Sequence, residues 1–332
     1  MQKALLAIDV GGSTTRAYLV TPDGRCLGYG RNRGGNPASN KPDFAAASII
    51  AAVETAVAQA GGPFDITIAQ IALAGPQAHV AVARLEEAFR RLGLSGPIAF
   101  AGDLLAMFAS VSLATEGYCV VCGTGAGAIR IRGSEIDRVV DLAGWLLGDL
   151  GSGYWLGREA AKAAAADMEG RGDATALTRL VLAELGIADE TDDRFQGRPL
   201  ALRQLIDAVY ALRPIELARF APLVVANRDD PVAATLIARA EAYLIEDFRT
   251  AFDPGVPGPV ALGGGVIAHL RGVAVGIGDI VRAAGHVPDI RPVVDGSVGA
   301  IVLAMRATGI AVDEMLFETV TNSVAARTKP AA

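Results

Sequence analysis

Short apolar runs alternate with longer amphipathic stretches along the chain, and glycine-rich turns separate many of them. The first apolar run, residues 4–8, ends at Asp9; a turn rich in glycine and hydroxyl residues at 11–14 and a second apolar run at 15–20 follow. A Pro-Asp-Gly turn then leads into residues 26–33. The opening therefore predicts three consecutive strands, with a glycine-rich turn between the first two.

The pattern then alternates between two periods. Apolar residues recur at helical spacing in residues 43–59, 80–92 and 104–111, whereas residues 66–73 and 98–101 are short apolar runs. We therefore expect three helices and two further strands. Together with the opening strands, they predict one α/β domain built on a mixed sheet.

The same order begins again at residue 117. Residues 117–131 read as strand, glycine-rich turn and strand, and residues 139–142 as a third short strand. A loop at 144–152 leads into a helix at 153–166. The order of elements matches that of the opening, although the residues differ. This match predicts a duplicated half with its own phosphate-facing turn.

The remainder of the chain is mainly helical. Residues 170–252 read almost wholly as helices, and Asp230 is predicted to cap the last of them, with Pro231 in its first turn. A strand at 259–262 runs into three glycines, and residues 296–306 form a final helix.

These elements predict a two-domain α/β fold with duplicated mixed-sheet halves. The N-terminal domain covers residues 1–115, and the C-terminal domain covers 116–306 with a helical insertion at about 170–252. Residues 307–332 form a tail that can pack back on the N-terminal domain.

Composition narrows the class of protein. The chain has 332 residues, of which 52% are hydrophobic and 20% charged, enough to bury large cores. Its net charge of −6 argues against a nucleic-acid-binding protein, which usually has a basic face. The apolar run before Asp9 is too short for a signal peptide, and no stretch is typical of a transmembrane helix. With only three cysteines, we expect a cytoplasmic protein with no nucleic-acid or membrane partner.

Two of the cysteines, Cys119 and Cys122, have the spacing of redox or metal motifs. They lie in an apolar strand, where residues three apart point to opposite faces. No second cysteine pair accompanies them, and the chain has only three histidines. We therefore expect buried structural cysteines.

Three glycine-rich turns, each after an apolar strand, carry the candidate chemistry. One such turn could be an ordinary hairpin turn, but glycines also let backbone N–H groups approach a phosphate, and Ser and Thr hydroxyls add donors. Asp9 can hold Mg²⁺ through water, since Mg²⁺ prefers oxygen ligands and retains several waters. The P-loop motif is absent, and the first turn does not open a helix as the dinucleotide fingerprint does. The predicted nucleotide-binding residues are Asp9, Gly11, Gly12, Ser13, Thr14, Gly123, Thr124, Gly125, Gly264 and Gly265.

Over residues 1–306, these three ordered turns resemble those of the actin, heat-shock-chaperone and sugar-kinase superfamily, whose two domains clamp a nucleotide. The run Gly-Asp-Leu-Gly-Ser-Gly-Tyr-Trp at 148–155 is similar, more narrowly, to the N-acetylglucosamine kinase family and its bacterial BadF-type relatives. The resemblance implies an actin-like (ribonuclease-H-like) ATPase fold, ATP and Mg²⁺ as cofactors, and a homodimer. Supporting motifs are Gly35-Asn36-Pro37, Ala74-Gly75, Gly102-Asp103, Gly123-Thr124-Gly125 and Gly144-Trp145.

The same resemblance implies residue roles. Asp103 is the implied catalytic base, accepting the proton of a sugar hydroxyl as that hydroxyl attacks the γ-phosphate. The implied acceptor is the 6-OH of an amino sugar, N-acetylglucosamine or glucosamine. Trp145 would offer an apolar face to the sugar ring. The implied substrate-binding residues are Asn36, Gly75, Asp103, Gly144, Trp145 and Asp149.

Each of these residues also has a purely structural alternative. Asp103 precedes an apolar helix and could be its N-cap. Asn36 could belong to a simple turn, and Trp145 could be a core residue. Asp149 could stabilise its own loop, and the glycines at 263–265 could form only a strand-to-helix turn.

This chain departs from the family pattern near the sugar substituents. Leu150 stands where the family usually has Glu, and the loop between Trp145 and Asp149 is shorter. Gly127 offers no side chain to an acetamido group. Glucosamine, N-acetylmuramic acid and a neutral hexose therefore stay open as substrates.

Two other functions also stay open. An activator ATPase of the 2-hydroxyacyl-CoA dehydratase type would need cysteine ligands at a dimer interface, which Cys119 and Cys122 on opposite strand faces fit poorly. A non-catalytic sugar sensor would need a DNA-binding region, and none precedes the first strand at Ala4.

Overall fold

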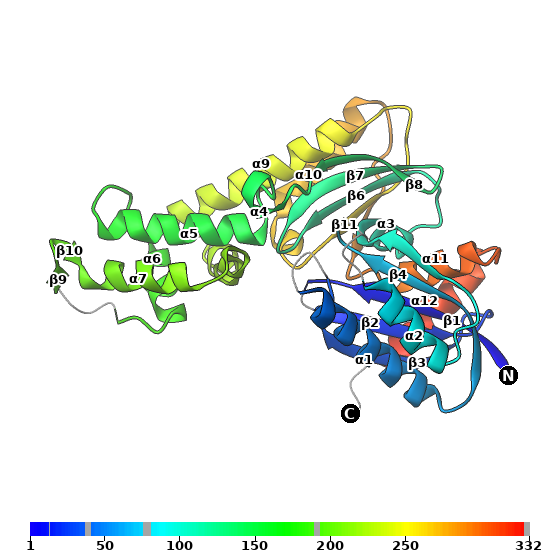
Figure 1. Cartoon of the computed structure of the whole chain (residues 1–332). Coiled ribbons are helices and arrows are strands. Elements are labelled where there is room, and N and C mark those ends of the chain that lie inside the picture. Colours follow the sequence, from blue (N-terminus) through cyan, green and yellow to red (C-terminus); the bar gives the residue numbers. More distant parts are fainter. Residues whose placement is uncertain (13, 37–40, 76–80, 189–192, 329–332) are drawn as a thin grey trace. The chain divides into compact units, whose positions relative to one another are not determined.

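The structure is a computed structural model that describes residues 1–12, 14–36, 41–75, 81–188 and 193–328. The chain divides into two compact units (Figure 1). Unit 1 comprises Met1–Thr115 and Pro292–Ala332, and unit 2 comprises Glu116–Arg291. The sequence analysis placed residues 292–306 in the second domain; the structure groups them with unit 1, because the helix they contain packs on the first sheet.

Unit 1 contains a five-stranded mixed sheet in the order β3-β2-β1-β4-β5. β1 and β2 pair antiparallel, as do β2 and β3, whereas β1, β4 and β5 run parallel. β1, β3, β4 and β5 therefore all end at the same edge of the sheet. The bounds are β1 Gln2–Val10, β2 Thr14–Val20, β3 Cys26–Arg33, β4 Phe64–Leu73 and β5 Ile98–Gly102.

Helices cover both faces of this sheet, because alternate residues of β1 point to opposite sides. Leu6 and Ile8 pack with α1 and α2, while Leu5 and Ala7 pack with α11 and α12. The C-terminal helix lies along β3, where the Cys26 N–H donates to Ser323 Oγ at 2.7 Å. The helix bounds are α1 Pro42–Ala60, α2 Val82–Arg91, α3 Asp103–Ala109, α11 Ser297–Ala307 and α12 Glu314–Thr328.

Helix α1 is a core helix of unit 1. Among the described residues it alone is long and apolar enough to cross a membrane, although the sequence analysis singled out no such stretch. It packs directly on β3, where a Cβ at Gly28 or Gly30 would lie 1.9 Å from a carbonyl oxygen of α1. Seven of its residues, from Ala45 to Ala56, are buried in this contact and against the rest of the sheet.

Unit 2 repeats the topology of unit 1. Counted from its antiparallel side, its sheet has the order β8-β7-β6-β11-β12, with β6 and β11 parallel. This is the strand order of unit 1, so the predicted duplication of mixed-sheet halves is confirmed. The bounds are β6 Gly117–Cys122, β7 Ala126–Arg132, β8 Glu135–Asp141, β11 Val260–Gly263 and β12 Ile290–Val293.

Helices make up most of the rest of unit 2, and several extend beyond its sheet (Figure 1). Asp230 caps α9 as predicted, accepting from the Ala233 N–H at 2.9 Å. The predicted loop at 144–152 contains the short helix α4, and residues 194–199, inside the stretch predicted as almost wholly helical, form a hairpin of β9 and β10. The helices are α4 Gly144–Leu147, α5 Gly153–Met168, α6 Ala176–Glu184, α7 Leu200–Ala211, α8 Ala221–Ala226, α9 Pro231–Ala251 and α10 Arg271–Ala283. The 3₁₀ turns η2 (Pro214–Phe220) and η3 (Ile267–His269) and the strands β9 (Arg194–Phe195) and β10 (Arg198–Pro199) complete the unit.

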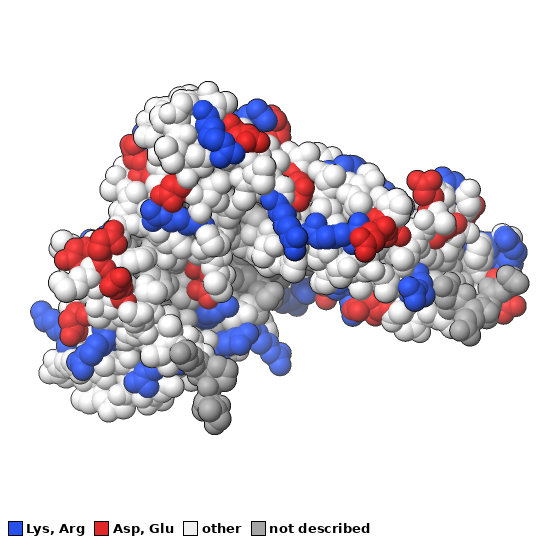
Figure 2. Space-filling view, turned by 180° about the vertical axis from the view of Figure 1, so that it is seen from behind, with Lys and Arg blue, Asp and Glu red and all other residues white. Residues whose placement is uncertain are grey.

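The surface carries both signs of charge. On the face shown in Figure 2, basic and acidic side chains are interspersed with large uncharged areas. Such mixing is typical of the surface of a globular protein.

Candidate functional site

In unit 1, the first glycine-rich turn lies beside a partly buried ion-pair network. Asp9 in β1 is directly opposite Arg16 in β2, and its Oδ2 accepts from Arg16 Nη1 at 3.2 Å. Arg16 Nε also lies 3.6 Å from Oδ2 of Asp295, just before α11. The Ser297 N–H holds Asp295 Oδ1 at 2.9 Å. One arginine thus bridges two carboxylates at the end of β1.

The charge of this network is unbalanced. Asp9 is buried, and its burial raises the pKa of the carboxyl to about 7; the negative charges of Asp295 and Asp103 act in the same direction, while Arg16 opposes them. Burial disfavours the ionised form of a carboxylic acid. Arg16 only partly neutralises the negative charge of these carboxylates. The excess negative charge would stabilise a cation bound here.

Asp103 is the first residue of α3, at the end of β5. Gly102 is the N-cap, and Oδ1 of the Asp103 carboxylate accepts from the Leu104 N–H at 2.9 Å. The N-cap alternative is thus wrong in position, although the carboxylate does bind the start of the helix. Burial raises the pKa of Asp103, which makes this carboxylate a better proton acceptor near neutral pH.

The other predicted residues of unit 1 lie after the same strand ends. Gly11 closes the first turn by donating to the Thr14 carbonyl at 2.9 Å, next to the exposed Gly12. Asn36 is buried after β3, and Gly75 follows β4 with a φ of 80° that favours glycine. Because β1, β3, β4 and β5 end at one edge, these positions share that edge with Asp103. Ser13 lies outside the described residues.

In unit 2, the second and third glycine-rich turns are in contact. They follow the neighbouring parallel strands β6 and β11, and the Val266 N–H donates to the Cys122 carbonyl at 2.9 Å. A Cβ at Gly264 would lie 2.4 Å from that carbonyl oxygen, and its φ is 101°. Only glycine fits here without strain. Two turns far apart in the sequence therefore form one surface.

The start of α5 organises the second turn. The Gly153 and Tyr154 N–H groups donate to the carbonyls of Gly123 and Thr124, at 2.8 and 3.2 Å. The helix therefore occupies the carbonyl side of this turn. Within the described residues, the Thr124 and Gly125 N–H groups have no acceptor, so the N–H side is available to a ligand.

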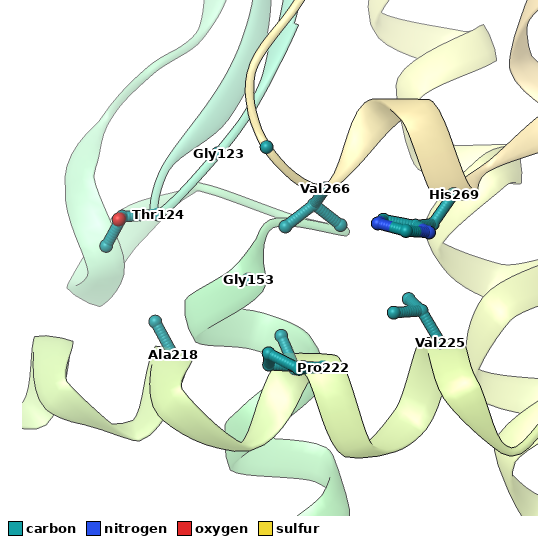
Figure 3. A pocket seen from close by; sticks show the side chains of 10 residues that line it. Gly123, Thr124, Gly153, Ala218, Pro222, Val225, Val266 and His269 are labelled. Atoms are coloured by element: carbon teal, nitrogen blue, oxygen red, sulfur yellow. The ribbon is translucent and has the colours of Figure 1, made fainter. Parts of the chain in front are cut away.

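A cavity of about 340 Å³ opens beside these turns (Figure 3). Thr124 lies at one end of it and His269 at the other, with Val266 facing Pro222 and Val225 across the space. Its lining is thus mainly apolar, with glycine backbone at one end. The lining residues are Gly123, Thr124, Gly153, Ala218, Ala221, Pro222, Val225, Gly265, Val266 and His269. Apolar clefts of this size with a few polar groups are typical small-molecule sites.

The loop before α5 places two predicted sugar-binding residues differently. Asp149 is buried, and its Oδ1 accepts from the Ala126 N–H at 3.1 Å, behind the second turn. Burial raises the pKa of the Asp149 carboxyl, and the Ala126 hydrogen bond opposes that shift. Trp145 follows Gly144 and is 39% exposed, with its ring 6.1 Å from that of Tyr154, so it is not a core residue.

Sequence reasoning missed three residues of these two sites: Arg16, Asp295 and His269. Arg16 could have been predicted, because pairing the first two strands antiparallel across the first turn places it opposite Asp9. The others depend on contacts between segments far apart in the chain or on backbone geometry.

The cysteines do not form a site. Cys119 and Cys122 are buried, as predicted, and the Cys122 thiol donates to the Gly151 carbonyl at 3.4 Å. Burial raises the pKa of Cys122, so its thiol is unreactive. Within the described ranges, no group of three or more His, Cys, Asp or Glu could hold a metal ion.

Two duplicated mixed-sheet units, with glycine-rich turns at the ends of their parallel strands, place the chain in the fold class of the actin-like ATPases and sugar kinases. The family model of the BadF/BadG/BcrA/BcrD ATPases matches residues 6–304. The chain belongs to this family.

Solved structures support the fold. A candidate N-acetylglucosamine kinase from Chromobacterium violaceum is 24% identical, with a TM-score of 0.70 over 91% of this chain and 99% of the other. Another from Porphyromonas gingivalis is 22% identical, with a TM-score of 0.69 over 92% and 100% of the two chains. A glucokinase of the ROK family from Streptomyces griseus, solved with glucose and AMPPNP, is 20% identical, with a TM-score of 0.51 over 91% and 99%. None of the curated proteins compared with the chain matches it.

Proposed function

We propose that this protein is an ATP-dependent sugar kinase that transfers the γ-phosphate to a hydroxyl, the 6-OH, of an amino sugar such as N-acetylglucosamine or glucosamine. The observation that carries the proposal is the cavity of unit 2, which combines two touching glycine-rich turns with an apolar slot. A nucleotide has the same two parts, a polyanionic phosphate chain and a flat apolar base. The family and the sugar kinases among the structural neighbours support this function.

The phosphates are assigned to the glycine-rich turns. The Thr124 and Gly125 N–H groups and the Thr124 hydroxyl can donate to phosphate oxygens, and the Gly264–Gly265 turn completes the cradle. The base is assigned to the slot between Val266 and Pro222, with His269 at its far end. The first turn, from Gly11 to Thr14, is assigned to the phosphates as well.

The charges around Asp9 favour a divalent cation nearby. The carboxylates of Asp103 and Asp295 repel negative charge at Asp9, which such a cation would relieve, although the described carboxylates do not form a group that could bind one ion directly. Asp9 would hold the ion through water. When bound, the ion neutralises charge on the transferring phosphate.

Asp103 is assigned as the general base that accepts the proton of the substrate hydroxyl. Its Oδ1 is held by the Leu104 N–H, which fixes the carboxylate at the end of β5 and leaves Oδ2 for the substrate hydroxyl. Its raised pKa suits a general base at neutral pH. Phosphoryl transfer depends mainly on positioning and charge stabilisation, so this base and the cradle are the main protein groups required. Sugar binding is assigned to Asn36, Gly75, Gly144, Trp145 and Asp149. Asp149 would act indirectly, through the turn that it supports.

The test is ADP release in a coupled assay with Mg²⁺ over a panel of hexoses, amino sugars and N-acyl amino sugars. We expect turnover with at least one amino sugar and none without sugar beyond a slow background. Sugar-independent ATP hydrolysis by a brown, iron-containing protein would instead identify the activator ATPase. The buried Cys119 and Cys122 argue against that alternative.

Sugar binding without any turnover would instead identify the sugar sensor. We also propose that the protein is a cytoplasmic homodimer that binds neither nucleic acid nor membrane. Sedimentation at several concentrations tests the dimer.

A further inference from the structure

The cavity of unit 2 is a slot whose two walls pack against one helix. The turn after β11 provides Val266 on one wall, and α8 provides Pro222 and Val225 on the other (Figure 3). Helix α5 begins between them, where a Cβ at Gly153 would lie 3.3 Å from Val266 Cγ2 and 3.7 Å from Ala221 Cβ. The start of α5 therefore fixes how far apart the walls stand.

The wall formed by α8 is fixed a second time through η2, which leads directly into it. A Cβ at Gly157 of α5 would lie 1.8 Å from the Leu217 carbonyl oxygen of η2, so the two backbones are in contact. A slot of fixed width between apolar walls selects a flat ring by its shape.

Few groups in the slot can form hydrogen bonds with such a ring. In the described lining, only Thr124 and His269 have side chains with hydrogen-bonding atoms, and they lie at opposite ends. The Val266 and His269 N–H groups already donate to the Cys122 and Val266 carbonyls, both at 2.9 Å. Pro222 has no N–H. With Thr124 assigned to the phosphates, His269 is the side chain of the described lining that meets the edge of the base.

This imidazole suits more than one base edge. A neutral imidazole has one donor and one acceptor nitrogen, and exchange of its tautomer or rotation of its ring reverses their order. His269 and Pro222 are both exposed, so water reaches this end of the slot. A hydrogen bond that replaces one to water contributes only about 0.5–1.5 kcal/mol.

Adenine and hypoxanthine have nearly the same outline but opposite edges. Adenine presents an amino donor beside an acceptor nitrogen, whereas hypoxanthine and guanine present a carbonyl acceptor beside an N–H donor. A site with buried groups built for one pattern rejects the other by about 10⁴–10⁵-fold, because its own groups are left unpaired. The exposed imidazole of His269 imposes no such penalty.

We propose that this slot recognises a purine by its shape and does not distinguish 6-amino from 6-oxo purines, so that ITP and GTP serve as phosphoryl donors as well as ATP. This inference rests on the proposed kinase function and widens its nucleotide class. The transfer is the same with each donor. The bond between the γ-phosphorus and the bridging oxygen breaks, the sugar oxygen takes the phosphoryl group, and the nucleoside diphosphate leaves.

The test is displacement of a ribose-labelled fluorescent ADP from the native protein by ADP, IDP or GDP, with Mg²⁺ and without sugar. We expect the dissociation constants of IDP and GDP to lie within about tenfold of that of ADP. Weaker binding of either diphosphate by more than that overturns the inference. If both are weak, the edge at His269 is read; if only GDP is weak, its 2-amino group is excluded.

His269→Phe keeps a flat ring and removes both nitrogens. We expect the affinities for ADP and IDP to fall by the same factor, at most about tenfold, so that their ratio is unchanged. His286→Phe is the matched control, because this histidine of unit 2 is exposed, lies outside the lining and has its Nε2 3.0 Å from the Pro254 carbonyl. A ratio that changes more than tenfold in His269→Phe would show that the imidazole reads one fixed pattern.

Val266→Ala tests whether the base lies in the slot. Loss of two methyl groups from one wall should weaken ADP and IDP equally, by about tenfold. Val275→Ala is the control, because Val275 lies on α10, is 61% exposed and does not line the cavity. Unchanged affinity for both diphosphates in Val266→Ala would place the base elsewhere and overturn the inference.

The outcomes separate the two proposals. Displacement uses diphosphates without sugar, so equal binding of ADP, IDP and GDP upholds the slot even if no sugar is phosphorylated, which refutes only the kinase. Turnover of a sugar with ATP, together with IDP bound more than tenfold more weakly, refutes the wider nucleotide class and leaves the kinase standing. If both proposals hold, kcat/KM for ITP lies within about tenfold of that for ATP on the same sugar.

Discussion

The two units share a strand order but differ in the chemistry at the ends of their parallel strands. In unit 1 that edge carries Asp9, Arg16, Asp103 and Asp295, a network with more negative than positive charge. In unit 2 the corresponding edge carries glycine turns and a mainly apolar cavity, whose described lining includes no acidic or basic side chain except the imidazole of His269. The carboxylate beside these turns, Asp149, accepts from a backbone N–H. The same topology therefore carries a cluster of charged side chains in unit 1 and an apolar cavity in unit 2. Substitutions in unit 1 should affect chemistry, and those in unit 2 should affect binding.

The largest effect is expected from Asp103→Asn. The amide cannot accept the hydroxyl proton, so kcat should fall by about 10²–10⁴-fold with little change in sugar or nucleotide affinity. ADP release gives kcat, and calorimetry gives the two affinities.

The control for this variant is Asp43→Asn, another aspartate in the first turn of a helix, whose side chain is 93% exposed. It should retain native activity. If Asp103→Asn stays near native kcat, unit 1 does not supply the base and the contrast between the units fails.

Asp9→Asn should come next in size. Without its carboxylate the unit loses one of three negative charges near the assigned Mg²⁺ position, and the Mg²⁺ concentration for half-maximal activity should rise about 10–100-fold. Equilibrium titration of Mg²⁺ with nucleotide present provides the readout besides activity. Asp23→Asn, on a side chain 70% exposed, is the control. An unchanged Mg²⁺ requirement would remove Asp9 from the metal assignment.

Gly264→Ala tests the binding role of unit 2. The new methyl group would meet the Cys122 carbonyl at 2.4 Å, so the contact between the two turns must open. We expect ATP affinity to fall about tenfold and stability to fall by about 1–3 kcal/mol, with sugar affinity retained. Gly62→Ala is the control, because Gly62 lies outside the cavity and a Cβ there would meet nothing nearer than 3.8 Å. Equal effects of the two substitutions would count against the steric argument.

The order of elements was predictable from the sequence because it is a local property. Apolar runs between turns located the strands of both sheets except β12, which was not predicted, and placed β8 four residues too late. The Asp-Pro pair at 230–231 located the start of α9. The grouping of α11 with unit 1 was not predictable in this way, since it depends on packing between segments almost 300 residues apart.

The glycine-rich turns could be predicted from the sequence, but the directions in which the side chains point could not. The three turns were found because glycines follow apolar strands in the sequence, and at Gly264 the left-handed φ and the close Cys122 carbonyl explain why the residue is glycine. Asp149 was assigned to the sugar, yet its carboxylate supports a backbone N–H behind the turn, and no local pattern distinguishes these directions. Asp141 carried no signal at all, because its left-handed φ and its clasp of Leu150 exist only in the folded loop.

The smallest predicted effect concerns a buried carboxyl away from the cavity. Burial raises the pKa of Asp247, on α9, to about 7, and the charges of Asp141 and Glu246 add to this shift. One oxygen, Oδ2, is buried without a hydrogen-bond partner among the described residues. The folded protein therefore keeps a proton that the unfolded chain releases above its ordinary value of 3.8. Its contribution to stability is lost as the pH rises from about 4 to about 7.

Asp247→Asn should remove this loss. The variant should match the native protein near pH 4 and exceed it by about 1 kcal/mol above pH 7, because the partly solvated site screens much of the shift. Urea unfolding at several pH values measures the difference, with Asp207→Asn, on a side chain 61% exposed, as the control. A gain that is the same at every pH would show that packing, and not the charge, sets the effect. A gain in stability only at high pH, with kcat unchanged, would show that the Asp247 charge destabilises unit 2 without affecting its binding surface.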